Sequence, residues 1–183
     1  DFVKQLPDGR YEVNVLKINE QGDTEYTKIY TCKHLFVNAG VVGTMQILLK
    51  SKYLGGLVNL NDEVGKHWGN NGNVMAMRVL LNEETGADQC IVPVTAYGDL
   101  NNPVAPLLAE QAPFPIGMEL KQLLTLAITK NPNRGYFKYN PATDNAELYF
   151  DSSQMELSRR AMGNFIDRLN AANGGSLDRL FYF

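Results

Sequence analysis

One carboxylate, Glu110, lies in an apolar, proline-framed stretch of the chain, Leu107–Pro115. An apolar setting makes a carboxyl group hold its proton more readily, which suits it to proton transfer near neutral pH. The alternative is that Glu110 lies on the solvent side of an edge strand, which is the commoner arrangement for a glutamate. Glu119 is a second candidate for the same role, and the sequence alone does not separate the two.

A glycine turn is the second feature that could support chemistry. The run Asn38-Ala39-Gly40-Val41-Val42-Gly43 follows a short apolar stretch and precedes a helical pattern. Glycine at such a turn lets a ligand approach the backbone, and the first amides of the helix point toward it, as in dinucleotide-binding folds. The alternative is a tight turn that needs glycine only for packing, because the first glycine of GxGxxG and the usual acidic residue for a ribose are missing.

Other kinds of site find little support. The only histidines, His34 and His67, belong to no cluster at metal-ligand spacing, and no GxSxG motif is present. The cysteines, Cys32 and Cys90, are far apart and predict buried thiols. The net charge is −3, with dispersed charges and no basic patch, which argues against nucleic-acid binding. No apolar run approaches the ~20 residues of a membrane span.

The elements around the glycine turn follow from periodicity. Alternating residues predict strands over Arg10–Ile18 and Glu25–Cys32, joined in a small antiparallel meander. The apolar run Lys33–Val37 is typical of a strand buried on both faces. A helix follows over Thr44–Ser51, and the Gly- and Asn-rich stretch Lys52–Asn73 predicts a linker or domain crossing.

The second part of the chain predicts β structure and one long helix. We expect strands over residues 74–81, 89–97, 104–112, 123–129, 135–139 and 147–150, with 123–129 paired to 135–139 through the turn 131–134. Ser153 and Glu156 have the spacing of a capping box. Apolar residues then fall on one helical face, and two glycines end the helix: Met155, Met162, Phe165, Ile166, Leu169, Gly174 and Gly175. The fold class is therefore α+β, with a nucleotide-fold piece first and a mostly antiparallel sheet second.

These segments also resemble a known family. The run Leu35–Thr44 is similar to the late strand and turn of bacterial FAD-dependent cholesterol oxidases, members of the glucose–methanol–choline oxidoreductase family. Asn59–Gly65 and Trp68–Asn73 resemble the segment that follows, and Leu126–Gly135 and Tyr139–Asp144 resemble the substrate domain. The resemblance runs in order from about Gly9 to the end of the chain.

The resemblance implies residue roles. Ala109-Glu110 before Ala112-Pro113 matches the motif that carries the family's glutamate base, so it favours Glu110 over Glu119. Asn38, Ala39 and Gly40 match the turn that contacts FAD, although the family more often has glycine at the position of Asn38. Leu108 is another departure, because relatives carry an aromatic residue there. His34 and His67 do not match the family's catalytic histidine.

The resemblance also implies an organisation and an activity. Residues 1–70 would be part of an FAD-binding α/β domain, and residues 71–183 an incomplete steroid-binding domain. The enzyme would oxidise a 3β-hydroxysteroid to the ketone with oxygen as electron acceptor, and would isomerise the double bond. The GxGxxG motif and the redox His and Asn are not among these 183 residues, so we expect an internal, inactive fragment whose partners are the other segments of the same protein. A sterol substrate, a membrane surface from which it is extracted, and a secreted or cell-surface bacterial enzyme are further implications.

Two other hypotheses stay open. One is a flavin-free module that binds a sterol or another lipid through a sheet face; its candidate residues are Leu107, Phe114, Leu124 and Phe137. The other is a related oxidoreductase that acts on a non-sterol alcohol. The colour of the purified protein separates the first of these from a flavoenzyme.

Overall fold

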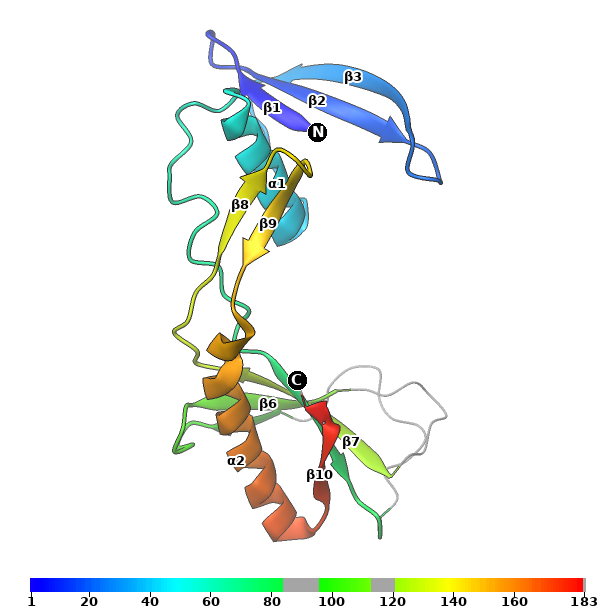
Figure 1. Ribbon diagram of the computed structural model, residues 1–183, viewed down its shortest axis with the longest axis vertical. Coiled ribbons are helices and arrows are strands. Elements are labelled where there is room, and N and C mark those ends of the chain that lie inside the picture. The colour runs from blue at the N-terminus through cyan, green and yellow to red at the C-terminus, as the bar shows by residue number, and fades with distance from the viewer. Residues whose placement is uncertain (84–95, 113–120, 183) are drawn as a thin grey trace. The chain divides into compact units, whose positions relative to one another are not determined.

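The computed structural model describes residues 1–83, 96–112 and 121–182 (Figure 1). Its elements are strands in antiparallel sheets and two α-helices, one of them long, which confirms the predicted α+β class. The chain forms two compact units: Asp1–Trp68 with Arg134–Phe150, and Gly69–Asn133 with Asp151–Phe183. The functional division into residues 1–70 and 71–183 stays a prediction, but Arg134–Phe150 packs with the first unit.

The first unit opens with the predicted meander. Strands β1 (Phe2–Gln5), β2 (Tyr11–Ile18) and β3 (Thr24–Cys32) pair antiparallel in that order. Helix α1 spans Gly40–Tyr53, so the predicted helix is present and longer than expected. The stretch after it, predicted as a linker, contains no helix or strand before residue 74.

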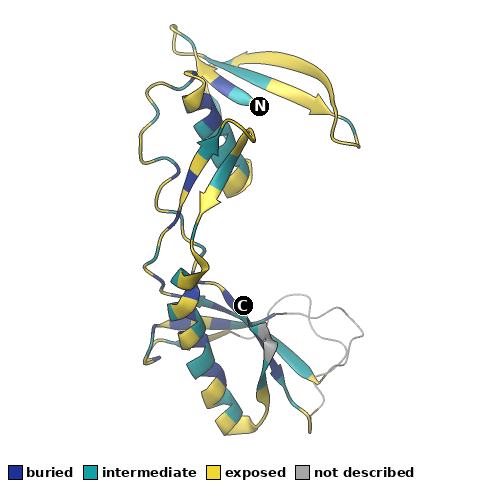
Figure 2. Ribbon diagram, in the orientation of Figure 1, coloured by how far each residue is buried: buried dark blue, intermediate teal, exposed yellow. Residues whose placement is uncertain are grey.

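The predicted buried strand Lys33–Val37 is wrong. These residues form no strand, and Phe36 is 85% exposed. The strand before them, β3, is also exposed along nearly its whole length (Figure 2). A strand needs a neighbour to take up its backbone hydrogen bonds, and none of the described strands pairs with Lys33–Val37. The apolar run therefore predicted a buried strand, but no described strand pairs with it.

A hairpin completes the first unit. Strands β8 (Tyr136–Asn140) and β9 (Asn145–Tyr149) pair with each other, so the predicted pairing of 123–129 with 135–139 is wrong. Local turn chemistry decides the pairing. The Asn140 side chain accepts a hydrogen bond from the Ala142 N–H at 3.0 Å and donates one to Glu147 at 2.6 Å, closing the turn. The hairpin packs on α1, where Lys50 pairs with Asp144 at 2.8 Å.

The second unit is a five-stranded antiparallel sheet in the order β10-β4-β7-β6-β5. Its strands are β4 (Val74–Val79), β5 (Ala96–Asp99), β6 (Leu107–Ala112), β7 (Gln122–Thr129) and β10 (Ser176–Tyr182). Of the predicted strand 89–97, residues 89–95 lie outside the described part. The predicted strand 104–112 begins only at Leu107, because Pro103 and Pro106 cannot donate backbone hydrogen bonds to a ladder.

The long helix α2 (Glu156–Asn173) follows a short 3-10 turn, Ser152–Met155, and lies against one face of the sheet (Figure 1). The predicted capping box of Ser153 and Glu156 is wrong. The 3-10 turn intervenes, and Asp151 with Gln154 form the box instead. The predicted apolar face is confirmed: Met155, Met162, Phe165 and Ile166 are buried and Leu169 is half-buried, and Gly174 ends the helix at φ 77°.

Candidate functional site

Glu110 lies in the middle of β6, a strand with neighbours on both sides. It faces Leu126 of β7 and Ala96 of β5 in the registers of the two antiparallel pairs. The predicted strand is present, but β6 is not an edge strand, and the Glu110 side chain is half-buried. The backbone at Glu110 is therefore paired on both sides within the sheet. Glu119 lies outside the described residues.

The two faces of the sheet have different surroundings. Leu107 and Ala109, the alternate residues of β6, are buried on the face that α2 covers. Arg78 of β4 lies on that covered face too, where its guanidinium donates to Asn170 and Asn173 of α2 at 2.9 and 2.6 Å. Because side chains alternate along a strand, Glu110 points from the opposite face.

We call the opposite surface the Glu110 face. It is formed by described residues that share the parity of Glu110 across four strands, among them Met75, Met77, Leu124, Leu126, Ile128, Leu108, Glu110, Ala112, Ala96 and Gly98. Two of them, Met77 and Ala112, are buried. Leu126, Ile128 and Met75 are half-buried, and Leu108 is 38% exposed. A single carboxylate thus lies among large apolar side chains that the described part of the chain leaves partly open.

No described side chain or amide satisfies the Glu110 carboxylate. Within residues 1–83, 96–112 and 121–182 it accepts no hydrogen bond and forms no ion pair. Most other acidic groups have a partner, as Glu147 does with Asn140, Thr143 and Tyr149. A carboxylate that projects from a central strand and has no partner in the described part of the chain is placed to accept a proton from a molecule on the apolar face.

The proposed lipid-binding set does not form one surface. Leu107 and Leu124 lie on opposite faces of the sheet, because Leu107 shares the register of the covered face and Leu124 faces Ala112. Phe137 belongs to the first unit, where its ring meets the Trp68 ring edge-on at 6.3 Å. Phe114 lies outside the described residues. The prediction of a common face is therefore wrong, since strand parity and chain crossings separate its members.

The glycine turn lies at the start of α1, in the first unit. Asn38, Ala39 and Gly40 are all exposed, and Gly40 has φ 69°, a conformation that favours glycine. Asn38 is not among the residues with positive φ. The substitution of asparagine at this position therefore causes no backbone strain.

The first turn of α1 fits an electron-rich ligand. The N-cap residue Ala39 provides no side-chain hydrogen bond, and no acidic residue lies in the first turn. The first amides of the helix are thus left without an internal partner. Beside the turn, a cavity of about 230 Å³ is lined mostly by apolar residues, with Asn38 and Ala39 at its wall. These features are compatible with a flavin cofactor at this turn, although they cover only a small part of such a molecule.

The histidines and acidic residues give no metal site. Among the described residues, no three His, Cys, Asp or Glu side chains come together. His34 is exposed, and the His67 ring contacts Glu63 at 3.0 Å. Lys66 and His67 hold the pKa of Glu63 below its usual value. No helix in the described part of the chain is long and apolar enough to cross a bilayer.

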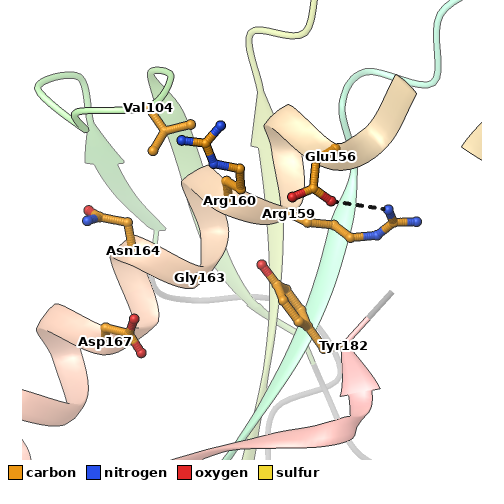
Figure 3. A pocket seen from close by; sticks show the side chains of 8 residues that line it. All are labelled: Val104, Glu156, Arg159, Arg160, Gly163, Asn164, Asp167 and Tyr182. Atoms are coloured by element: carbon orange, nitrogen blue, oxygen red, sulfur yellow. Dashed lines mark ion pairs between the residues drawn. The ribbon is translucent and has the colours of Figure 1, made fainter. Parts of the chain in front are cut away.

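A second groove, with a volume of about 450 Å³, lies along α2 (Figure 3). Sequence reasoning missed it, although the glycine inside the α2 pattern, Gly163, was a signal. A Cβ there would come 3.1 Å from the Tyr182 hydroxyl. Burial raises the pKa of Tyr182, and Glu156 pairs loosely with Arg159 at 3.8 Å. The groove is lined by acidic and basic side chains together, including Glu156 and Arg159. It therefore differs from the surroundings of Glu110, where a carboxylate lies among apolar side chains.

One comparison with known proteins bears on this geometry. Residues 71–182 match the sequence profile of the family described as GMC oxidoreductase, C-terminal. The match covers the whole five-stranded sheet, α2 and Glu110. The carboxylate and the apolar face around it therefore lie inside the matched region, whereas the turn Asn38–Gly40 lies before it.

Proposed function

Because this chain belongs to the GMC oxidoreductase family, we propose that it forms part of a flavin-dependent sterol oxidase. The enzyme oxidises a 3β-hydroxysteroid to the 3-ketosteroid, passes the electrons to oxygen and isomerises the double bond. The observation that carries the proposal is the carboxylate of Glu110, which has no partner among the described residues and lies on an apolar sheet face. The resemblance of the Ala109–Pro113 segment to the family's base motif supports the same role.

Glu110 acts as the base in the isomerisation. The oxidised substrate presents an acidic proton on the carbon between its new carbonyl and its double bond. The carboxylate removes this proton and returns it to the distal carbon of the original double bond, which moves the double bond into conjugation with the carbonyl, so that one group serves both transfers. Leu108, Leu126 and Ile128 contact the apolar body of the steroid and exclude water from the carboxylate.

When bound, FAD would supply the redox chemistry, as the acceptor of a hydride from the alcohol carbon. In this chain the exposed turn of Asn38, Ala39 and Gly40, with the uncapped first amides of α1, would hold part of the cofactor. The pyrophosphate-binding GxGxxG and the redox His and Asn come from parts of the protein other than these 183 residues. The isolated chain is therefore expected to be colourless and inactive.

The base assignment is tested with Glu110→Gln in the full-length oxidase. Glutamine keeps the size of the side chain and cannot take up the proton. We expect formation of the conjugated enone to fall by about a hundredfold or more, with ketone formation and steroid binding changed much less. Glu12→Gln, on a half-buried strand position of the first unit, is the matched control. Enone formation at the wild-type rate in Glu110→Gln would remove Glu110 from the mechanism.

A second candidate is oxidation of a non-sterol alcohol by the same family machinery. Leu108 favours it, because the resemblance implies an aromatic residue at this position and the leucine, which is smaller, is itself 38% exposed. Full-length enzyme that oxidises a non-steroid alcohol with a higher kcat/KM than a 3β-hydroxysteroid would establish this alternative. For a sterol oxidase, we propose transient contact with a membrane surface to extract the sterol; co-sedimentation of the full-length enzyme with sterol-loaded vesicles tests this.

A further inference from the structure

Gly98 is a strand glycine whose presence none of the described residues explains. It lies inside strand β5, where glycine weakens a strand because it has no side chain to pack. Gly98 is not among the residues with positive φ, so the backbone conformation does not require glycine. No described atom lies within 4 Å of the position that a Cβ would take. At Gly72 and Gly135, by contrast, a Cβ would come within 2.2 and 2.6 Å of a neighbour.

The position of Gly98 relates it to the candidate base. Gly98 pairs with Leu108, and Ala96 pairs with Glu110, so both small residues lie on the Glu110 face. Gly98 is a diagonal neighbour of Glu110, at a typical Cα separation of ~7–8 Å. On the other side of Glu110, strand β7 presents Leu126 and Ile128 to the same face.

The relief of the face is therefore uneven around the carboxylate. On the β7 side the face has the long side chains of Leu126 and Ile128. On the β5 side the described residues of the face are the small Ala96 and Gly98. Ala96 and Gly98 are exposed. Leu108, which pairs with Gly98 from the neighbouring strand β6, is 38% exposed. A strand glycine with open space above it often marks close approach of a ligand or another backbone.

We infer that Gly98 determines substrate size at this site by keeping the β5 side of Glu110 low enough for a broad, flat apolar ring system. The inference rests on the proposed function, since it takes the Glu110 face as the substrate surface. A side chain at position 98 would occupy the space beside the carboxylate and displace a wide substrate, with the effect growing with side-chain volume. A narrow substrate would pass the same obstacle.

The test is equilibrium dialysis of a 3-ketosteroid, the product, with full-length enzyme carrying Gly98→Ala, Gly98→Val or Gly98→Leu. Because the product does not turn over, binding is measured apart from catalysis. We expect the dissociation constant to rise along the series, by about tenfold or more for leucine, as for added bulk in an apolar site. Tyr97→Leu, on the same strand but the opposite face, is the matched control and should bind as wild type.

Each outcome has a defined meaning. Equal affinity across the position 98 series would overturn the inference. A loss of affinity that Tyr97→Leu shares would also overturn it. A loss that accompanies a lowered Tm and loss of flavin would do the same, because it would indicate that β5 packs against another backbone. Wild-type enzyme that binds no steroid would refute the proposed function instead. Steroid binding that ignores position 98, with enone formation lost in Glu110→Gln, would refute only the role of Gly98.

Discussion

The two faces of the five-stranded sheet differ in the size and burial of their central side chains: small ones are fully buried on one face, and larger apolar ones are partly exposed on the other. The face under α2 carries small residues at its centre, Ala76, Ala109 and Ala127, and these are at most 1% exposed. The Glu110 face carries larger apolar residues; Met77 is 4% exposed, but Leu126 and Ile128 beside Glu110 are only half-buried. Alanines let the helix approach the sheet closely, so small residues belong to the structural face. Large apolar residues left partly open are instead typical of a surface that contacts something else.

The largest expected contrast comes from truncating a side chain in each environment. Met162 of α2 is fully buried against the sheet, so Met162→Ala should lower the free energy of unfolding by about 3 kcal/mol through lost burial and a cavity. Ile128→Ala on the Glu110 face should cost about half as much, because its side chain is already partly in water. Urea unfolding measures both. Equal losses would mean that the Glu110 face is packed as tightly as the helix face.

The next contrast concerns a buried cation on the covered face. Arg78 is 4% exposed and donates to Asn170, Asn173 and the carbonyl oxygen of Gly174, at the C-terminal end of α2. Its charge complements the negative end of the helix dipole. Arg78→Met should lower the free energy of unfolding by about 2 kcal/mol, because three acceptors lose their donor. Arg78→Lys, which keeps the charge, should recover part of it. A fully stable methionine variant would show that the contacts are replaceable by apolar packing.

A smaller effect is expected from the polar contacts where α2 begins to cover the sheet. The Ser158 hydroxyl is fully buried, lies 2.5 Å from the Thr129 hydroxyl and accepts a hydrogen bond from Asn131 at 3.0 Å. Ser158→Ala removes this shared partner and should cost about 1 kcal/mol in unfolding free energy. Ser153→Ala, at an exposed position, is the control. If both variants unfold alike, the buried network adds nothing to helix docking.

The smallest effect lies outside the sheet, in the first unit. Hydrogen bonds from Lys50 and Tyr139 lower the pKa of Asp144 from its usual value of 3.8. The stabilisation is therefore present above that value and is lost as pH falls through the lowered pKa of the folded state. Asp144→Asn should flatten the decline in Tm between about pH 5 and pH 2, and only slightly, because the carboxylate is 59% exposed. Asp23→Asn, a carboxylate without an ion pair in the described part of the chain, should leave the decline unchanged.

The sequence predicted well those elements that depend on local patterns. The alternation in Tyr11–Ile18 and Thr24–Cys32 and the apolar face of α2 depend only on neighbours two to four residues away, and each element is present. The choice of Glu110 over Glu119 came from a motif, and its catalytic role stays a prediction. The Asp151 cap was missed because Ser153 and Glu156 have the same spacing, and only the backbone shows where the helix begins.

Long-range pairing was decided by the tertiary structure alone. The partner of β8 is β9, not β7, because the turn after Asn140 brings β9 alongside. Lys33–Val37 reads as a buried strand but lacks a neighbouring strand among the described residues. The sequence alone determined that Glu110 lies on a strand in an apolar stretch. Only the register and the docking of α2 decided that it points away from the helix, beside Gly98, because strand parity assigns a side chain to a face only once one face is covered.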